Sequence, residues 1–236
     1  MFENSRFLSG TPRGTRNLII INIIVFVFTA LNRGFMTETF GLFYPASPYF
    51  HWWQYVTHLF MHGGFWHIFF NMYSLWLFGS MVERTVGTRK FLTLYFVCGL
   101  GAVALHLGVM GLQVSGFQSQ MNDPMLDYAQ QALAKSRYMD VLRTPTVGAS
   151  GAIYGLMLAY AMLYPDNRFT LIFPPVTLRA KTMVLIFAAI ELFTGVRGIT
   201  DGVAHFAHLG GMLFALLLVG YWRRRGRLFD DYGMYQ

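Results

Sequence analysis

The chain has 236 residues, of which 55% are hydrophobic and only 12% are charged. Soluble domains carry roughly 25% charged residues, so this composition excludes an ordinary soluble domain and indicates an integral membrane protein. The formal charge is +7. The basic residues nevertheless lie between apolar segments and form no single stripe, which argues against nucleic acid as a partner. The single cysteine, Cys98, excludes an internal disulfide framework.

Six segments approach the roughly 17 to 25 mostly apolar residues that a membrane-spanning helix needs. In chain order we place these spans at about 17–33, 65–82, 91–112, 147–164, 181–197 and 203–222. Residues 1–16 then form an N-terminal segment, where the lack of an apolar core predicts no cleavable signal, and residues 223–236 form a tail. The expected fold class is therefore an all-α, polytopic membrane protein whose one domain, residues 17–222, is a six-transmembrane-helix bundle.

Positive charge predicts the orientation of this bundle. If the N-terminus is cytoplasmic, the inner segments hold 13 of the 18 Lys and Arg residues. Cytoplasmic loops carry such an excess, so we expect both termini in the cytoplasm and membrane lipid around the spans. The absence of an organellar targeting segment fits a bacterial inner (cell) membrane.

Two long connections are then expected on the outer side. Residues 34–64 are rich in aromatic side chains and contain the helix breakers Pro45 and Pro48, which predicts a loop in the headgroup region. Residues 113–146 are polar and predict a loop with a short helix over 125–140.

Polar side chains gather near the outer ends of three predicted spans. The second span has His67 and Asn71 in its first two turns, the fourth has Ser150, and the sixth has His205 and His208. At about 1.5 Å per residue, all of them fall within roughly 10 Å of the outer end of their helix. Polar groups are costly inside a membrane and tend to mark function, so we expect a site at this depth that water reaches from outside.

Helical spacing predicts how these groups face one another. Ser150 and Tyr154 are four residues apart and share a helix face. Small residues let two helices approach closely in lipid, and they form a stripe beside Ser150 and another beneath His208. The stripes consist of Gly151 and Gly155 on the fourth span, and Gly211 and Ala215 on the sixth. If the two stripes meet, Ser150 and His208 face each other.

This arrangement predicts nucleophilic chemistry. A serine hydroxyl needs a base within about 2.6–3.2 Å, and a neutral imidazole is suited to that role. His67 and Asn71 share one face of the second span and can both donate hydrogen bonds to a developing oxyanion, as can the backbone N–H of Ser150. The second, fourth and sixth spans hold no acid at this depth, which predicts a Ser–His dyad. Glu191, an acid deep in the fifth span, leaves a triad as the alternative.

Three stretches resemble the signature regions of one known family, the rhomboid intramembrane serine proteases. They are HGGFWHIFFN (62–71), with an HxxxN pattern, GASGAIYG (148–155), with GxSG, and AHLGGMLFA (207–215), with AHxxG. The resemblance covers about residues 17–222 in a six-span, rhomboid-like arrangement. It implies an intramembrane serine endopeptidase that uses no cofactor or metal, and substrates that are transmembrane segments of other proteins.

The resemblance also implies a role for each matching residue. Ser150 is the implied nucleophile and His208 the general base, whereas His67 and Asn71 join the Ser150 amide in an oxyanion site. Tyr154 matches a tyrosine that packs against the catalytic imidazole. The implied supporting glycines are Gly148, Gly151 and Gly211. The AHxxG spacing selects His208 over His205 as the base.

One position departs from the family pattern, and two further histidines stay open. The family often has Trp-Arg in the first connection, whereas this chain has Trp53-Gln54. His58 and His62 are spaced i, i+4 and suit a metal, but no carboxylate or cysteine is nearby, which favours structural hydrogen bonding.

Two other functions compete with the protease. One is a catalytically inactive, rhomboid-like membrane chaperone, although such proteins lose the serine or histidine that this chain retains. The other is a bis-histidine haem or metal membrane protein that uses His67, His205 and His208.

Overall fold

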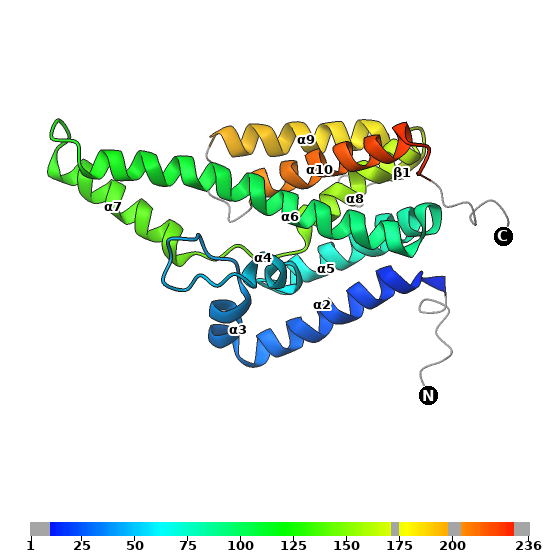
Figure 1. Ribbon diagram of the computed structural model, residues 1–236, viewed down its shortest axis with the longest axis horizontal. Coiled ribbons are helices and arrows are strands. Elements are labelled where there is room, and N and C mark those ends of the chain that lie inside the picture. The colour runs from blue at the N-terminus through cyan, green and yellow to red at the C-terminus, as the bar shows by residue number, and fades with distance from the viewer. Residues whose placement is uncertain (1–9, 171–174, 198–203, 229–236) are drawn as a thin grey trace.

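The structure is a computed structural model that describes residues 10–170, 175–197 and 204–228 (Figure 1). Apart from one two-stranded hairpin, the regular structure of these residues is helical. The elements are α2 (Arg13–Leu31), α3 (Arg33–Phe40), α4 (Gln54–Thr57), the 3₁₀ helix η1 (His58–Phe60), α5 (Phe65–Ser74), the π-helical turn η2 (Leu75–Gly79), α6 (Ser80–Met121), α7 (Tyr128–Arg143), α8 (Ser150–Leu163), β1 (Arg168–Thr170), β2 (Thr177–Arg179), α9 (Ala180–Arg197) and α10 (His205–Arg224). The predicted fold class, an all-α polytopic membrane protein, is confirmed.

Each predicted span corresponds to a helix. α2, α8, α9 and α10 lie within a few residues of the predicted first, fourth, fifth and sixth spans. The start of the sixth prediction, at residue 203, lies outside the described residues. The second span is built from α5, η2 and the first turns of α6, and the chain then turns back at Gly87 (Figure 1). Gly87 has φ +80°, a left-handed conformation that glycine adopts without steric cost.

The helices differ in how completely their length and composition suit a bilayer. Among the described residues, α2, the continuous segment Phe65–Met121 and α10 are long and apolar enough to cross a membrane. α8 is apolar but has only 14 residues. It packs against α6, α9 and α10, and most of its side chains are buried, so it is the central helix of the bundle. Helices at the rim instead expose large apolar side chains, as a lipid-facing surface requires.

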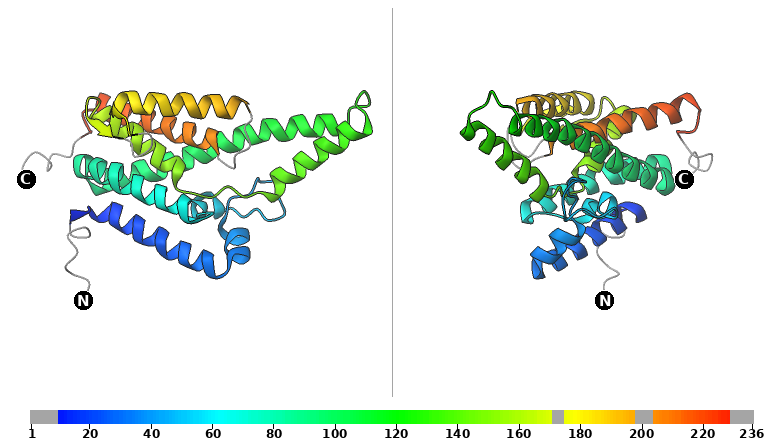
Figure 2. Two further views of the ribbon diagram at one scale, coloured as in Figure 1. Left: turned by 180° about the vertical axis from the view of Figure 1, so that it is seen from behind. Right: turned by 60° about the vertical axis from the view of Figure 1, so that its left-hand side comes forward.

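The connection at 113–146 is more helical than predicted. α6 continues to Met121, and α7 folds back beside it, so that a helical hairpin projects beyond the bundle (Figures 1 and 2). The short helix predicted at 125–140 corresponds to α7, shifted by three residues, whereas residues 113–121, predicted as loop, belong to α6. Hydropathy marks where the apolar stretch ends, but the backbone hydrogen bonds of α6 continue past that point. α7 begins at a capping box in which Asp127 and Gln130 bond each other's backbone N–H groups.

The connection at 34–64 is also partly helical, through α3, α4 and η1, although Pro45 and Pro48 lie in its non-helical part. Gln54 organises this connection from a completely buried position. Its side-chain oxygen accepts from the N–H groups of Phe43 and His51. Its amide nitrogen donates to three backbone carbonyls, those of Glu38, Thr39 and Tyr49. A glutamine can do both because its amide carries a donor and an acceptor, whereas arginine only donates.

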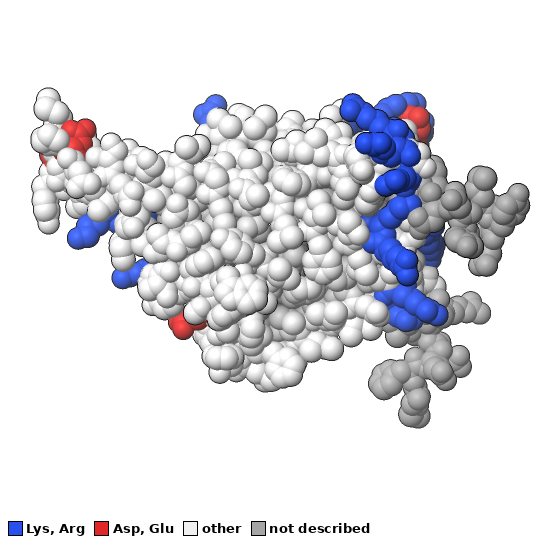
Figure 3. All heavy atoms as spheres, in the orientation of Figure 1, with Lys and Arg blue, Asp and Glu red and all other residues white. Residues whose placement is uncertain are grey.

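Lysine and arginine gather at one end of the bundle, where α2 begins and α10 ends (Figure 3). α8 begins at Ser150 and runs toward this basic end, so its first residue is at the end of α8 farther from the basic residues (Figure 1). The basic end includes the turn between α5 and the long arm of α6, and the antiparallel β1–β2 hairpin between α8 and α9. The residues at these element ends are Arg13, Arg16, Arg84, Arg89, Lys90, Arg168, Arg179, Lys181 and Arg223 to Arg225.

Candidate active site

Ser150 is the first residue of α8, and the segment before it is held in place by the first connection. The backbone N–H of Gly148 donates to the carbonyl of His58 (3.0 Å), and Thr146 pairs with Leu42 through two backbone hydrogen bonds. Gly148 has φ +130°, and a Cβ there would lie 2.8 Å from His67 Nε2. Only glycine fits this backbone and this gap. As the first residue of a helix, Ser150 has a backbone N–H without an acceptor inside the helix.

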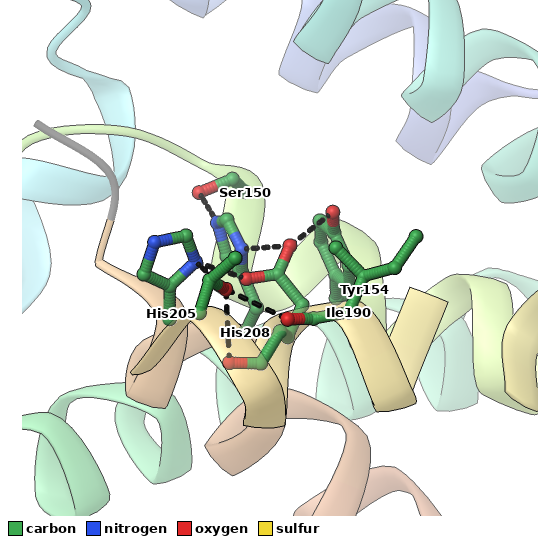
Figure 4. Close-up of polar contacts among 7 residues, drawn as sticks. Ser150, Tyr154, Ile190, His205 and His208 are labelled. Atoms are coloured by element: carbon green, nitrogen blue, oxygen red, sulfur yellow. Dashed lines mark hydrogen bonds and ion pairs between the residues drawn. The ribbon is translucent and has the colours of Figure 1, made fainter. Parts of the chain in front are cut away.

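The serine hydroxyl meets a histidine from another helix. Ser150 Oγ and His208 Nε2 are 2.8 Å apart, which is hydrogen-bond distance (Figure 4). The ring of Tyr154, one turn further along α8, stacks on the His208 ring with centroids 4.1 Å apart and planes 3° apart. The structure thus brings together the three residues for which the sequence predicted this contact, and Tyr154 holds the imidazole plane.

The approach of α8 to α10 depends on glycine. A Cβ at Gly211 would lie 1.8 Å from the carbonyl oxygen of Gly151, and one at Gly155 would lie 2.8 Å from the carbonyl oxygen of Gly211. The two predicted small-residue stripes therefore meet backbone to backbone. This contact sets the spacing at which Ser150 and His208 reach each other.

An acid from α9 completes the surroundings of His208. Glu191 Oε1 lies 2.9 Å from His208 Nδ1, a close contact that lacks the alignment of a hydrogen bond. The Tyr154 hydroxyl donates to the same oxygen (2.6 Å), and Glu191 Oε2 lies 2.7 Å from His205 Nδ1 (Figure 4). Thr194, one turn along α9, also contacts His205 Nδ1 (3.1 Å).

The sequence carries a partial signal for this acid. The dyad was predicted because the second, fourth and sixth spans hold no acid at this depth. The helices α5, α8 and α10 indeed contribute none, and the acid comes from α9 instead. Glu191 stands out as the one acid deep in the fifth span. Which face of α9 it occupies follows only from packing, and the structure turns it toward His208.

The predicted oxyanion donors lie in different environments. The His67 ring is next to Gly148, at the edge of the segment that carries Ser150. The side-chain nitrogen of Asn71 donates to the carbonyl of His67 on its own helix (2.8 Å), which uses one of its two hydrogens. Asn71 Oδ1 is buried without a hydrogen-bond partner. The structure therefore places His67 beside the nucleophile segment and turns Asn71 toward its own helix.

The two histidines of the first connection are buried in different ways. His58 Nδ1 contacts the carbonyl oxygen of Gln54 (2.9 Å), and burial lowers the pKa of His58 to about 4. His62 packs edge-on against His67, with ring centroids 5.0 Å apart, and burial lowers its pKa to about 3. Within the described ranges, no group of three or more His, Cys, Asp and Glu side chains is arranged to hold a metal ion.

These features define a class, a polytopic helical membrane protein in which a partly buried serine contacts a buried histidine, and the histidine contacts a buried acid, near one end of its central helix. Comparison with known proteins names the family. The model of the family described as "Rhomboid domain" matches residues 49–225, well over half of the chain. The chain belongs to the rhomboid family.

Two of three similar curated proteins are named rhomboid proteases, and the third is named a rhomboid-like protein. The chain is 27% identical over 226 residues to "Rhomboid protease AarA" of Providencia stuartii, which covers 92% of the chain and 74% of AarA. It is 27% identical over 224 residues to "Rhomboid protease GluP" of Bacillus subtilis, covering 92% of the chain but 37% of GluP. It is 28% identical over 172 residues to the human "Presenilin-associated rhomboid-like protein, mitochondrial", covering 70% of the chain and 38% of that protein. The chain thus spans less than half the length of two of these relatives. Membership of the rhomboid family, together with the protease names of these relatives, supports an intramembrane serine protease at the level of the family.

Proposed function

We propose that this protein is an intramembrane serine endopeptidase in which Ser150 is the nucleophile and His208 the general base. The observation that carries the proposal is the 2.8 Å contact between Ser150 Oγ and His208 Nε2, formed by residues 58 positions apart on two helices. A base at this distance removes the hydroxyl proton as the oxygen attacks. Both side chains match the serine and histidine patterns of the family to which the chain belongs.

The geometry supports a two-step reaction. Ser150 Oγ attacks the carbonyl carbon of the scissile peptide bond, and its proton passes to His208 Nε2. Collapse of the tetrahedral intermediate breaks the C–N bond, and His208 returns the proton to the departing amine. A water molecule then hydrolyses the ester by the same route and restores the serine.

The negative charge of the tetrahedral intermediate needs hydrogen-bond donors. The backbone N–H of Ser150 points out of the start of α8, where the helix end favours an anion. His67 lies beside Gly148 and offers a ring N–H, and Asn71 offers its remaining amide hydrogen. We assign these three groups to the oxyanion site, with His67 nearer to Ser150. Donors in such a site usually contribute the largest single part of acyl-transfer catalysis.

The arrangement of charge supports one orientation in the membrane, and that orientation and the membrane setting indicate the substrate class. The basic end of the bundle fits the cytoplasmic side, and α8 begins toward the other side, so both termini lie in the cytoplasm and the site opens outward. A transmembrane segment that reaches the site must unwind locally, because helical peptide bonds are already hydrogen-bonded and shielded. We therefore assign transmembrane segments of other proteins as substrates and a bacterial cell membrane as the setting.

The geometry gives less support to the two competing functions. An inactive chaperone has no need of an aligned serine and histidine. In a haem or metal protein the histidines would turn their ring nitrogens to a common centre. Instead, His208 contacts Ser150 and Glu191, whereas His205 Nδ1 contacts Glu191 and Thr194.

An activity-based fluorophosphonate tests the assignment on the purified full chain in detergent. We expect the wild type to label covalently, and both Ser150→Ala and His208→Ala to lose labelling while they remain folded. The same variants should fail to cut a single-pass reporter protein in proteoliposomes. Labelling that survives Ser150→Ala would exclude Ser150 as the nucleophile, and a haem absorbance band in the purified protein would support the competing cofactor function.

A further inference from the structure

Glu191 is unusual for its place in α9. Only four residues of this helix are buried, and the other three, Ala180, Met183 and Val184, belong to its first turns. In the half of α9 nearer the site, the only buried side chain is therefore a carboxylic acid. A buried acid that served packing alone would cost free energy against an apolar residue of similar size, so its partners must account for it.

These partners all belong to the candidate active site or border it. One carboxylate oxygen faces His208 Nδ1 (2.9 Å) and the Tyr154 hydroxyl (2.6 Å), and the other faces His205 Nδ1 (2.7 Å). Tyr154 also stacks on the His208 ring. The acid therefore fixes the imidazole from its edge, directly through Nδ1 and indirectly through the tyrosine on its face (Figure 4).

We propose that Glu191 is a positioning residue for the reaction, which makes His208 the middle member of a Ser150–His208–Glu191 triad. This inference rests on the proposed protease function. For Nε2 to accept the serine proton, the neutral imidazole must carry its proton on Nδ1, and a carboxylate beside Nδ1 selects that tautomer. When His208 takes up the serine proton, the ring becomes a cation next to the carboxylate.

The interaction strengthens as the reaction proceeds. In the resting structure the contact between His208 and Glu191 is close but not aligned as a hydrogen bond. Catalytic hydrogen bonds are often loose in a free enzyme and tighten in the transition state. An interaction that is stronger in the transition state than in the ground state raises the rate of the chemical step rather than the affinity for substrate. Loss of Glu191 should therefore lower kcat more than it changes KM.

The test compares two substitutions of Glu191 in the full chain with an acid-to-amide control elsewhere. Glu191→Gln keeps the shape but removes the charge, and we expect kcat for the reporter and the labelling rate to fall about 100-fold or more with KM nearly unchanged. Glu191→Asp keeps the charge, and we expect it to recover at least part of the rate. The control is Asp166→Asn, an exposed acid that pairs with Lys181 (2.8 Å) in the β-hairpin region, and it should retain wild-type rates.

A second measurement reads the histidine of the wild type directly and needs no variant of Glu191. In ¹⁵N-histidine NMR spectra, the signals that disappear in the His208→Asn variant should show the neutral ring with its proton on Nδ1. A neutral His208 protonated on Nε2, or wild-type kcat in a folded Glu191→Gln variant, would overturn the positioning role. If instead Ser150→Ala retained cleavage, the protease assignment itself would fall, so the two failures are distinguishable.

Discussion

The contact between Gly211 and Gly151 permits a sharp test of how helix packing produces reactivity. In Gly211→Ala, the new Cβ would lie 1.8 Å from the Gly151 carbonyl oxygen, whereas real Cβ atoms essentially never come within 3.0 Å of such an atom. Relief of the clash requires α8 and α10 to separate locally by about 1.2 Å, the difference between these two distances. Backbone atoms on both sides form this contact, so no flexible side chain can move away.

The separation acts on the reacting pair because His208 is one turn from Gly211 and Ser150 is next to Gly151. If more than about half of the displacement is transferred, the 2.8 Å contact moves beyond hydrogen-bond distance. Misplacement of catalytic groups by about 1 Å costs on the order of 100-fold in rate, equivalent to about 2.7 kcal/mol of activation free energy. We expect the fluorophosphonate labelling rate of Gly211→Ala to fall by at least this factor, and overpacking to lower its stability by about 1–3 kcal/mol.

The matched control is Gly220→Ala on the same helix. A Cβ at Gly220 meets no atom within 4 Å, so this substitution adds the same methyl group without a clash. Labelling of Gly220→Ala should match the wild type. A folded Gly211→Ala protein that labels at the wild-type rate would refute the claim that glycine packing sets the distance between the serine and the histidine.

Three further predictions concern the scaffold. The buried Glu83 carboxylate accepts from two backbone N–H groups in the first turn of α2, those of Gly14 and Thr15. Glu83→Gln should therefore lower the free energy of unfolding by about 1–3 kcal/mol and lower the thermal midpoint in detergent. The pKa of His58 is about 4 in the folded protein and 6.5 without burial, so the unfolded chain binds this proton first as the pH falls. Stability is then complete above pH 6.5 and declines by up to about 3 kcal/mol toward pH 4, and His58→Gln should flatten a plot of thermal midpoint against pH. Finally, Gln54→Ala removes the side-chain partner of one buried and several partly buried backbone groups, so limited proteolysis should cut the first connection faster than in the wild type, and equal cutting rates would contradict its organising role.

The sequence predicted the elements whose signals are periodic or compositional. The apolar stretches located helices, and i, i+4 spacing placed Ser150 and Tyr154 on one face of α8. The depth of His208 along its span also followed from counting residues, because helix rise is constant. Helix rise and periodicity follow from local backbone geometry, and the apolar composition follows from the lipid environment. Neither requires knowledge of how the helices pack.

The parts that were missed depend on rotation and on side-chain orientation. The rotation of α9 about its axis decides whether Glu191 faces lipid or His208, and α9 has no strong apolar stripe to reveal it. Asn71 stays a predicted oxyanion donor, but its spacing does not reveal that its amide also donates to the carbonyl one turn earlier, as short polar side chains often do. The helix predicted at 125–140 corresponds to α7, but the continuation of α6 to Met121 was missed, because polar residues still support a helix where backbone bonding favours one.

Two kinds of contact hold the candidate site, and they predict different responses to substitution. α8 and α10 meet through backbone atoms at Gly151 and Gly211. If a substitution pushes the two helices apart here, no rearrangement of side chains can bring the backbones back into contact. The half of α9 near the site is joined through one buried carboxylate, whose charge is what the histidines require. The activity lost in Gly211→Ala should therefore not return with any other side chain at position 211, because every side chain adds a Cβ. The activity lost in Glu191→Gln should return at least in part in Glu191→Asp. If the two classes of variant behaved alike, the acid would act only as another packing contact.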